Sequence, residues 1–237
     1  MKIVFTGGGT GGHIIPIIAI ARQLRKIYKE QDLELYFIGP KDELGSLLLS
    51  QEQIKTKHVL AGKIRNYLTL KSFFQNFIDL FFKIPIGFIQ SFFLFFFLSP
   101  DLVFSKGGYG SIPGTLAAKI LFVPIFLHES DVSPGKANKF LERFALKVFT
   151  SFPETEYFPL EKIICLGNPI RIELLNQSKE QAQDFFKITS QKPVILILGG
   201  SQGAQRINDK ILEVLSFLLK DFEVIHQSGE RLAQIRF

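Results

Sequence analysis

The run Lys2-Ile3-Val4-Phe5-Thr6-Gly7-Gly8-Gly9-Thr10-Gly11-Gly12-His13, residues 2–13, decides the fold of this chain. Its first half is short, apolar and β-branched, which is typical of a buried strand. Residues 14–28 then carry apolar side chains at helical spacing, with basic residues on the opposite side. The glycines therefore lie in a turn from a strand to a helix, and the free N–H groups at the start of that helix favour an anion such as phosphate.

Two other interpretations of the glycine run are open. The glycines could serve only the packing of a tight turn. Alternatively, Gly7, Gly9 and Gly12 fit the spacing G-x-G-x-x-G of a dinucleotide site. A dinucleotide site needs an acidic residue at the end of the second strand, whereas the predicted strand over residues 33–38 has its only acid, Glu34, near its start. The spacing alone is thus weak support for a dinucleotide.

The composition narrows the classes of protein and partner. The chain has 237 residues, of which 46% are hydrophobic, so it can form one large domain or one domain and part of another. The single cysteine, Cys165, excludes a disulfide framework and a cysteine-rich metal site. A net charge of +6 favours anionic partners. Because no zinc-finger, helix-turn-helix or RNA-binding pattern is present, we expect no nucleic-acid partner.

The chain in order reads as alternating strands and helices, which predicts an α/β fold with a parallel sheet. Three of the strands end in polar loops: the first glycine run, a second glycine loop at Gly107 to Ser111, and His128 to Asp131. Ligands of open parallel sheets bind at that edge. The predicted strands cover residues 2–6, 33–38, 57–60, 101–105, 123–127, 163–166, 194–198 and 222–226.

A second domain is predicted near the C-terminus. The buried strand over residues 194–198 enters a third glycine loop, residues 199–204, and a helix follows to about residue 219. We place a Rossmann-like N-terminal domain at residues 1–166 and a second Rossmann-like domain at residues 167–237. An independent domain usually needs about 100 residues, so we expect the second domain to be incomplete in this chain.

The most unusual region lies between the third strand and the fourth. Its first part is basic, and residues 73–98 then form a predicted helix with a very wide apolar face and a kink near Pro85. Three interpretations compete: a core helix, a membrane-surface helix with basic flanks, or a transmembrane span. The charge-free window over residues 84–100 is short for a span. The basic residues of the first part are Lys55, Lys57, Lys63, Arg65 and Lys71.

Six motifs in order resemble the MurG family of N-acetylglucosaminyltransferases. They are GGGTGGHIIP (7–16), GGYGSIPG (107–114), LHESD with SPGKAN (127–138), LGNPIR (166–171), GGSQGAQRIN (199–208) and HQSG (226–229). The resemblance implies two Rossmann-like domains of the architecture called GT-B. It also implies an inverting transfer of N-acetylglucosamine that needs no metal and no other cofactor.

The resemblance further implies the substrates and the location. The donor is UDP-N-acetylglucosamine, held mainly by the C-terminal domain. The acceptor is lipid I, an undecaprenyl-diphosphate-linked muramyl peptide held by the N-terminal domain, and the product is lipid II of peptidoglycan synthesis. A hydrophobic patch ringed by basic residues would bind the anionic cytoplasmic face of the plasma membrane as a peripheral contact, and residues 55–98 match that description.

Substrate-binding residues follow from the positions that match the family motifs. Glycine loops at helix starts supply N–H donors to diphosphates without a metal. Arg171 matches an arginine that binds the donor, where its charge could help UDP to leave. The first loop contributes Thr10, Gly11 and Gly12, the second Gly107 and Gly108, and the third Gly200, Ser201 and Gln202.

Two residues are candidates for the catalytic base. His13 follows the first loop, and a histidine suits the deprotonation of a sugar hydroxyl near neutral pH. It could instead hydrogen-bond a neighbouring loop. Glu129 is a candidate base or partner of the base, or a residue that orders its loop. We expect His128 and His226 to be structural, and Asp131 stands where many members of the family have asparagine.

The function predicted from the sequence is therefore transfer of N-acetylglucosamine to lipid I. The alternative is an inactive or split-gene fragment that acts at most as a membrane-associated binder of a lipid diphosphate. The family continues beyond the HQSG motif through segments that recognise the nucleoside and the sugar, so we expect this chain alone not to transfer sugar. A nicotinamide-dependent oxidoreductase is disfavoured by the missing acid at the end of the second strand.

Overall fold

The computed structural model describes residues 1–8, 11–65, 69–153, 156–200 and 203–229. The chain divides into two compact units, unit 1 at Met1–Ile172 and unit 2 at Glu173–Phe237. Each unit is described by itself.

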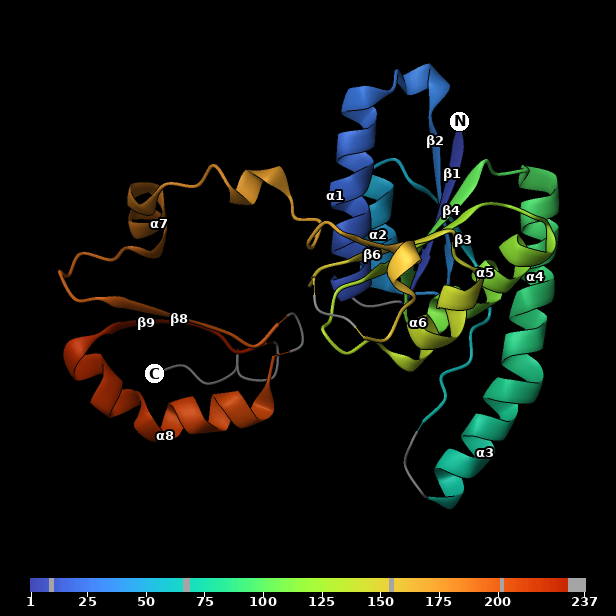
Figure 1. Ribbon diagram of the computed structural model, residues 1–237. Helices are drawn as coiled ribbons and strands as arrows, with labels where there is room; N and C mark the ends of the chain where they lie inside the picture. Colours follow the sequence, from blue (N-terminus) through green and yellow to red (C-terminus); the bar gives the residue numbers. More distant parts are fainter. Residues whose placement is uncertain (9–10, 66–68, 154–155, 201–202, 230–237) are drawn as a thin grey trace. The chain divides into compact units, whose positions relative to one another are not determined.

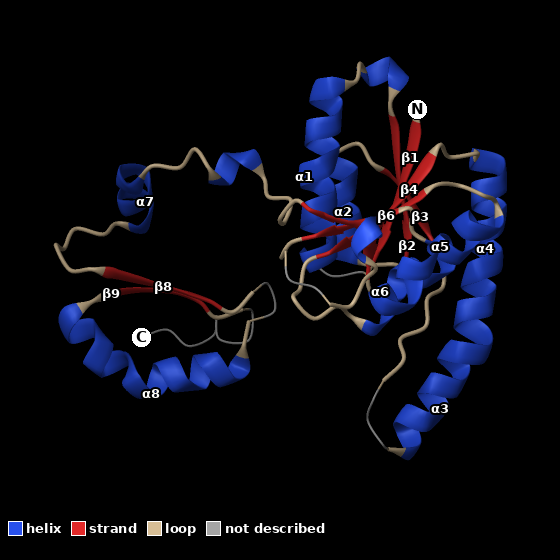
Figure 2. Cartoon of the chain, viewed as in Figure 1, coloured by secondary structure: helices blue, strands red, loops and turns tan. Residues whose placement is uncertain are grey.

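Unit 1 is built on a seven-stranded sheet in which every pair of neighbouring strands is parallel (Figure 2). The strand order is β3-β2-β1-β4-β5-β6-β7, so the order reverses between β1 and β4. This arrangement confirms the predicted α/β class and its parallel sheet. The strands are β1 (Lys2–Gly7), β2 (Glu34–Gly39), β3 (Lys55–His58), β4 (Leu102–Gly107), β5 (Ile125–Glu129), β6 (Lys147–Thr150) and β7 (Ile163–Cys165).

Helices cover both faces of this sheet, and each face has its own apolar core. Helices α1 (Gly11–Ile27) and α2 (Glu43–Gln51) lie on one face (Figure 1), where residues such as Ile17 and Leu49 are fully buried. Helices α4 (Ile84–Leu98) and α5 (Ile112–Ile120) lie on the other, where Phe95 packs with Ala117. Helix α6 (Lys136–Leu141) follows β5.

Three local predictions were wrong. The third strand, β3, runs over Lys55–His58 and thus begins two residues before the predicted 57–60. The strand β6 was not predicted, because Lys147–Thr150 is short and follows helical residues without a glycine or proline. The first helix begins at Gly11, inside the glycine run, because N–H groups of the first helical turn need no regular partner.

The phenylalanine-rich region forms one long, irregular helix. Helix α3 (Leu70–Ile78) passes through a π-helical turn over Asp79–Lys83 directly into α4. Pro85 stands just after the π turn, at a position where its missing N–H disturbs the helical hydrogen bonds. The irregularity predicted near Pro85 is therefore this π turn.

Unit 2 contains two parallel strands, β8 (Val194–Leu198) and β9 (Glu223–Gln227), with helices α7 (Lys179–Phe186) and α8 (Gln205–Asp221). The prediction that residues 194–198 are buried was wrong for alternate residues. Leu196 and Leu198 are 58% and 63% exposed. Side chains of a strand point alternately to its two faces, and α8 covers one face of the two-stranded sheet (Figure 1).

The position of α4 depends on a glycine, and we predict that Gly87→Ala destabilises unit 1. A Cβ at residue 87 would lie 1.8 Å from the backbone oxygen of Leu60, which cannot be relieved by a side-chain rotation. Overpacking of this kind typically costs about 1–3 kcal/mol, against an intrinsic helical gain of up to about 1 kcal/mol for alanine. Thermal unfolding should show a lower melting temperature.

Ser91→Ala on the same helix is the control. Its hydroxyl is buried and has no hydrogen-bond partner among the described residues, so its removal should not lower the melting temperature. A Gly87→Ala variant as stable as the parent protein would contradict the close contact.

Candidate functional site

The loops that follow β1 and β4 meet at the point where the strand order reverses. The Gly8 N–H donates to the Gly107 carbonyl at 3.0 Å, and Gly107 and Gly108 have φ angles of +86° and +77° that favour glycine. Crevices at such reversal points are the usual ligand sites of open parallel sheets. The first two predicted glycine loops are thus brought together in one place.

His13 lies between these two loops, in the first turn of α1. A Cβ at Gly8 would lie 3.1 Å from its Nδ1, and a Cβ at Gly108 would lie 2.8 Å from its Nε2. The imidazole therefore fits between them only because both residues are glycines. Burial, with a further contribution from the charge of Lys106, lowers the pKa of His13 to about 4, although Asp131 acts in the opposite direction. The ring is neutral at pH 7.

Glu129 ends β5 with its carboxylate turned into its own loop. Its Oε1 accepts from the Asp131 N–H at 2.9 Å, and its Oε2 accepts from the Gly135 N–H at 3.3 Å and from Asn138 Nδ2 at 2.8 Å. The side chain is buried together with that of Asn138, which stands over Gly107. These contacts hold the segment between β5 and α6 in place.

Lys106 is a residue of this site that the sequence prediction missed. It is 3% exposed at the end of β4, and its Nζ donates to Ser130 Oγ at 2.5 Å. Burial lowers the pKa of Lys106, while Glu129 and Asp131 act to raise it. The sequence feature that could have revealed Lys106 is a lysine directly before two glycines at the end of an apolar strand.

His128 connects β5 to the segment that carries Arg171. Its Nε2 lies 3.2 Å from the Gly167 carbonyl, and burial, followed by the charge of Lys106, lowers the pKa of His128 to about 4. Arg171 follows four residues after Gly167, and its Nε is buried without a hydrogen-bond partner among the described residues.

The third glycine loop belongs to unit 2, where it packs against the loop after β9. A Cβ at Gly203 would lie 2.2 Å from the Ser228 oxygen, and Asn208 Nδ2 donates to the same oxygen at 2.8 Å. Gly200 has a φ of +77° beside this contact. Three predicted site residues, Thr10, Ser201 and Gln202, lie outside the described residues.

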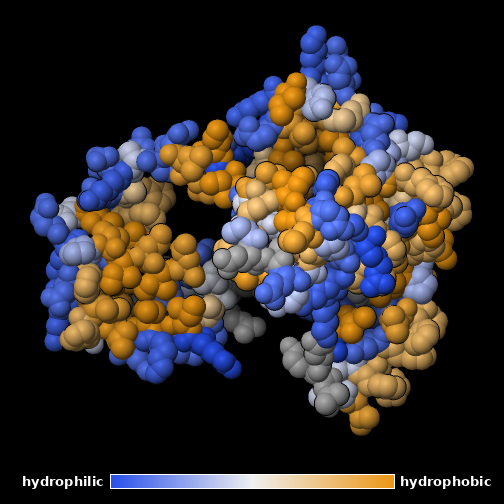
Figure 3. All heavy atoms as spheres, viewed as in Figure 1, coloured by the Kyte–Doolittle hydropathy of each residue, from blue (hydrophilic) through white to orange (hydrophobic). Residues whose placement is uncertain are grey.

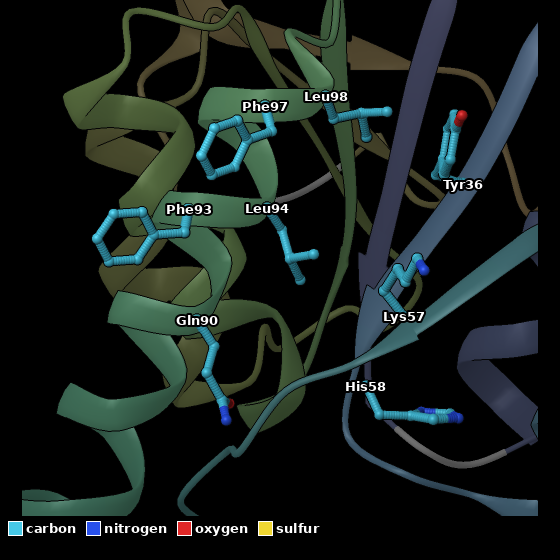
Figure 4. A pocket seen from close by; sticks show the side chains of 8 residues that line it. All are labelled: Tyr36, Lys57, His58, Gln90, Phe93, Leu94, Phe97 and Leu98. Atoms are coloured by element: carbon cyan, nitrogen blue, oxygen red, sulfur yellow. The ribbon is translucent and has the colours of Figure 1, made fainter.

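A hollow of unit 1 lies between α4 and the strands β2 and β3, with a volume of about 620 Å³ (Figure 4). Its α4 side is mostly apolar and its β3 side is basic. The side chains that line it are Tyr36, Lys57, His58, Gln90, Phe93, Leu94, Phe97 and Leu98.

The polar side chains of the long helix form a stripe that contacts the preceding segment, residues 60–65. Gln90 Oε1 accepts from the Leu60 N–H at 2.8 Å, and Asn76 Oδ1 accepts from the Arg65 N–H at 2.9 Å. Asp79 is 2% exposed and pairs with Arg65 at 2.8 Å and with Lys83 at 2.6 Å. The segment over residues 60–65 is thereby fastened along the helix.

The apolar faces of the same helix remain uncovered, and Figure 3 shows them as hydrophobic atoms over α3 and α4. Leu70–Leu98 is long and apolar enough to cross a membrane by length and composition, and 17% of its apolar window is buried. This low burial contradicts a core helix for most of its length. The phenylalanines of this helix that are more than half exposed are Phe73, Phe74, Phe81, Phe82, Phe93, Phe96 and Phe97.

Among the residues that the structure describes, no group of three or more His, Cys, Asp or Glu side chains is placed to hold a metal ion. Around β1, β4 and β5 the described residues offer glycine N–H donors, one buried ammonium, two neutral imidazoles and carboxylates. Such a set can bind an anion and accept a proton.

Sequence profiles of known families match both units. Residues 3–150 match the glycosyltransferase family 28 N-terminal domain, and residues 194–236 match the glycosyltransferase family 28 C-terminal domain. The first match alone covers more than half of the chain.

Individual relatives carry names of one kind. A UDP-N-acetylglucosamine–N-acetylmuramyl-(pentapeptide) pyrophosphoryl-undecaprenol N-acetylglucosamine transferase of Treponema denticola is 40% identical over 96% of this chain and 59% of its own length. A protein of the same name from Lachnospira eligens is 41% identical over 97% of this chain and 62% of its own length. The chain thus spans about three fifths of the curated relatives that it matches.

Solved structures agree with these matches. MurG of Acinetobacter baumannii superposes with a TM-score of 0.65 at 26% identity, over 98% of this chain and 59% of that one. A UDP-GlcNAc 2-epimerase of Neisseria meningitidis superposes with a TM-score of 0.59 at 17% identity, over 98% of this chain and 67% of that one, a likeness of fold alone. The resemblance to the MurG family and the GT-B type of α/β fold are confirmed.

The two depressed histidine pKa values predict an acid-sensitive fold. In the folded chain His13 and His128 have pKa values of about 4, below the ordinary 6.5. Between these values the unfolded chain binds more protons, so the cost of charging the two buried rings is absent above about pH 6.5 and grows as the pH falls toward 4. We expect a loss of about 1–3 kcal/mol for each histidine in urea unfolding measured across this range.

The double variant His13→Asn with His128→Asn should lose much less stability over the same interval. His58→Asn, at an exposed position, is the control and should follow the parent protein. An equally steep fall in the double variant would show that other groups cause the acid sensitivity.

Proposed function

The chain belongs to glycosyltransferase family 28, and we propose that, together with the donor-binding segments that its relatives have in addition, it transfers N-acetylglucosamine from UDP-N-acetylglucosamine to lipid I in the synthesis of lipid II. The observation that carries the proposal is the neutral imidazole of His13 between two glycine loops at the reversal point of the sheet. The names of the 40% identical relatives support the two substrates. Unit 1 takes the acceptor and unit 2 takes the donor.

The acceptor diphosphate lies against the loops after β1 and β4. Gly11 and Gly12 open α1, so their N–H groups have no partner within the helix and point out of its positive end. Thr10, Gly107 and Gly108 complete the proposed acceptor loops. A diphosphate bound by N–H donors and by the buried charge of Lys106 needs no metal in this arrangement.

His13 acts as the general base. The C4 hydroxyl of N-acetylmuramic acid attacks C1 of N-acetylglucosamine, the C1–O bond to UDP breaks with inversion, and the hydroxyl proton passes to the imidazole. Since the ring is neutral at pH 7, it can accept this proton. Glu129 is a positioning residue instead of the base, because both of its carboxylate oxygens already accept hydrogen bonds from its own loop.

The donor diphosphate lies at the third glycine loop. Gly200, Ser201 and Gln202 precede α8, whose N-terminus favours a phosphate. Arg171 of unit 1 contributes a guanidinium that stabilises the leaving UDP, and its Nε, buried without a partner among the described residues, supports an anionic ligand of that side chain.

The long helix binds the surface of an anionic membrane on the cytoplasmic side. Its polar stripe is occupied by residues 60–65, so its phenylalanines face outward, beside Lys71 and Lys83. Phe95 of the same helix is only 1% exposed because it packs into the core of unit 1. This packing favours a contact with the membrane surface over a span surrounded by lipid.

We predict that His13→Ala lowers turnover by roughly 10²–10⁴-fold, since a positioned general base contributes about that much. Product formation from UDP-N-acetylglucosamine and a lipid I analogue is measured by mass spectrometry. The assay uses the chain itself and a version extended with the remaining part of the Treponema denticola relative. Absence of product in both versions would contradict the proposed transfer and leave a non-catalytic binder of lipid diphosphates.

Glu129→Gln separates the two candidate bases. The substitution places an amide NH₂ against the N–H donors of the loop. It should therefore lower the free energy of unfolding by about 1–3 kcal/mol, seen as a lower melting temperature. His13→Ala should change turnover and leave the melting temperature nearly unchanged. A Glu129→Gln variant that melts like the parent protein and has no turnover would make Glu129 the base.

For the membrane contact, we predict that Phe74→Glu with Phe81→Glu abolishes binding to vesicles that contain anionic lipid. Both side chains are more than half exposed, so folding should tolerate the change. High salt should weaken the binding of the parent protein by screening its basic residues. Phe185→Glu in α7, at a position of unit 2 that is even more exposed, is the control; the same loss there would refute a specific role for the long helix.

A further inference from the structure

Lys106 occupies an irregular position in the sheet. Thr6 of β1 pairs with Ser105 of β4, but Gly7 pairs with Gly107, so Lys106 is an extra residue without a partner on β1. Such a bulge turns a side chain away from the direction that regular alternation would give it, and bulges are common beside active sites. The bulge lies at the carboxyl end of β4, where the candidate site begins.

The surroundings of Lys106 place its charge close to His13. A Cβ at Gly7 would lie 3.4 Å from the Cβ atoms of both His13 and Lys106, so the two side chains leave the backbone on either side of one glycine. The only hydrogen-bond partner of the Lys106 ammonium among the described residues is Ser130 Oγ. No carboxylate of the described residues lies within salt-bridge distance of this ammonium. A buried ammonium is costly in this state.

We propose that Lys106 is a positioning residue whose buried charge keeps the imidazole of His13 unprotonated while a diphosphate occupies the neighbouring glycine loops. An incoming diphosphate attracts protons to any nearby base. The fixed positive charge of Lys106 offsets that attraction, so the imidazole stays able to accept the acceptor's proton. The catalytic part of this role rests on the proposed function, whereas the electrostatic part can be measured without turnover.

Two charged groups of the described residues act on His13 from two elements. Lys106 of β4 opposes protonation, and Asp131 of the loop after β5 favours it. Glu129 and Asp131 both act on Lys106, and Lys106 also acts on His128. Neutralising Lys106 and neutralising Asp131 should therefore change the proton affinity of His13 in opposite directions, and only the change at Lys106 should also affect His128.

The test is the NMR titration of the four histidines in the full chain, with and without inorganic pyrophosphate. In Lys106→Met the proton affinities of His13 and His128 should each rise roughly tenfold, as expected for loss of one charge at this range. Asp131→Asn should lower the proton affinity of His13 and leave that of His128 unchanged, and Lys106→Arg should resemble the parent protein.

Pyrophosphate should raise the proton affinity of His13 more in Lys106→Met than in the parent protein. If Lys106→Met does not fold, Lys106→Gln, which retains a polar partner for Ser130, replaces it. An unchanged His13 titration in the neutral variant would overturn the proposal. If the titrations shift as expected but no version forms product, the electrostatic role stands and the proposed transfer fails.

Discussion

The close approach of the loops after β1 and β4 is the constraint on which the site depends. The Gly8 N–H reaches the Gly107 carbonyl, and the imidazole of His13 occupies the space that side chains at Gly8 and Gly108 would need. The ring is thereby fixed and partly shielded from water. Glycines that a sequence pattern assigns to phosphate binding thus also serve to place a side chain, so the packing interpretation of the run and the anion-binding one do not exclude each other.

The sheet could be predicted because its central strands are short apolar runs that end in glycines. The edge of the sheet was harder to predict. Lys147–Thr150 contains one lysine, one threonine and no boundary residue, so nothing local distinguishes β6 from a loop. Its pairing with β5 and β7 is what makes it a strand. The exposure of Leu196 and Leu198 was not predicted for a related reason. An apolar run in the sequence does not reveal which face of the strand a helix will cover.

The polar residues of the long helix illustrate the same limit. Their spacing along the helix places them on one stripe, and such a stripe usually faces water. Here Asn76, Asp79 and Gln90 instead bind backbone N–H groups of residues 60–65. The phenylalanines are left outside. The helix thus turns its polar side chains toward the protein and its apolar side chains outward, which is the opposite of a helix on the surface of a soluble domain. A large exposed apolar face of this kind is typical of a contact with another apolar phase.

Buried charge explains why the site has its particular composition. A lysine ammonium without a carboxylate partner costs stability, and the neutral rings of His13 and His128 make the fold acid-sensitive. A sequence cannot reveal these costs, because the bulge that turns Lys106 inward depends on the register between two strands far apart in the chain. Once the register is known, the helix start, the glycine N–H groups and the ammonium all present positive potential to the same edge of the sheet. A concentration of positive charge that is unfavourable on its own becomes favourable when an anion neutralises it, so the composition of this edge of the sheet suits an anionic ligand.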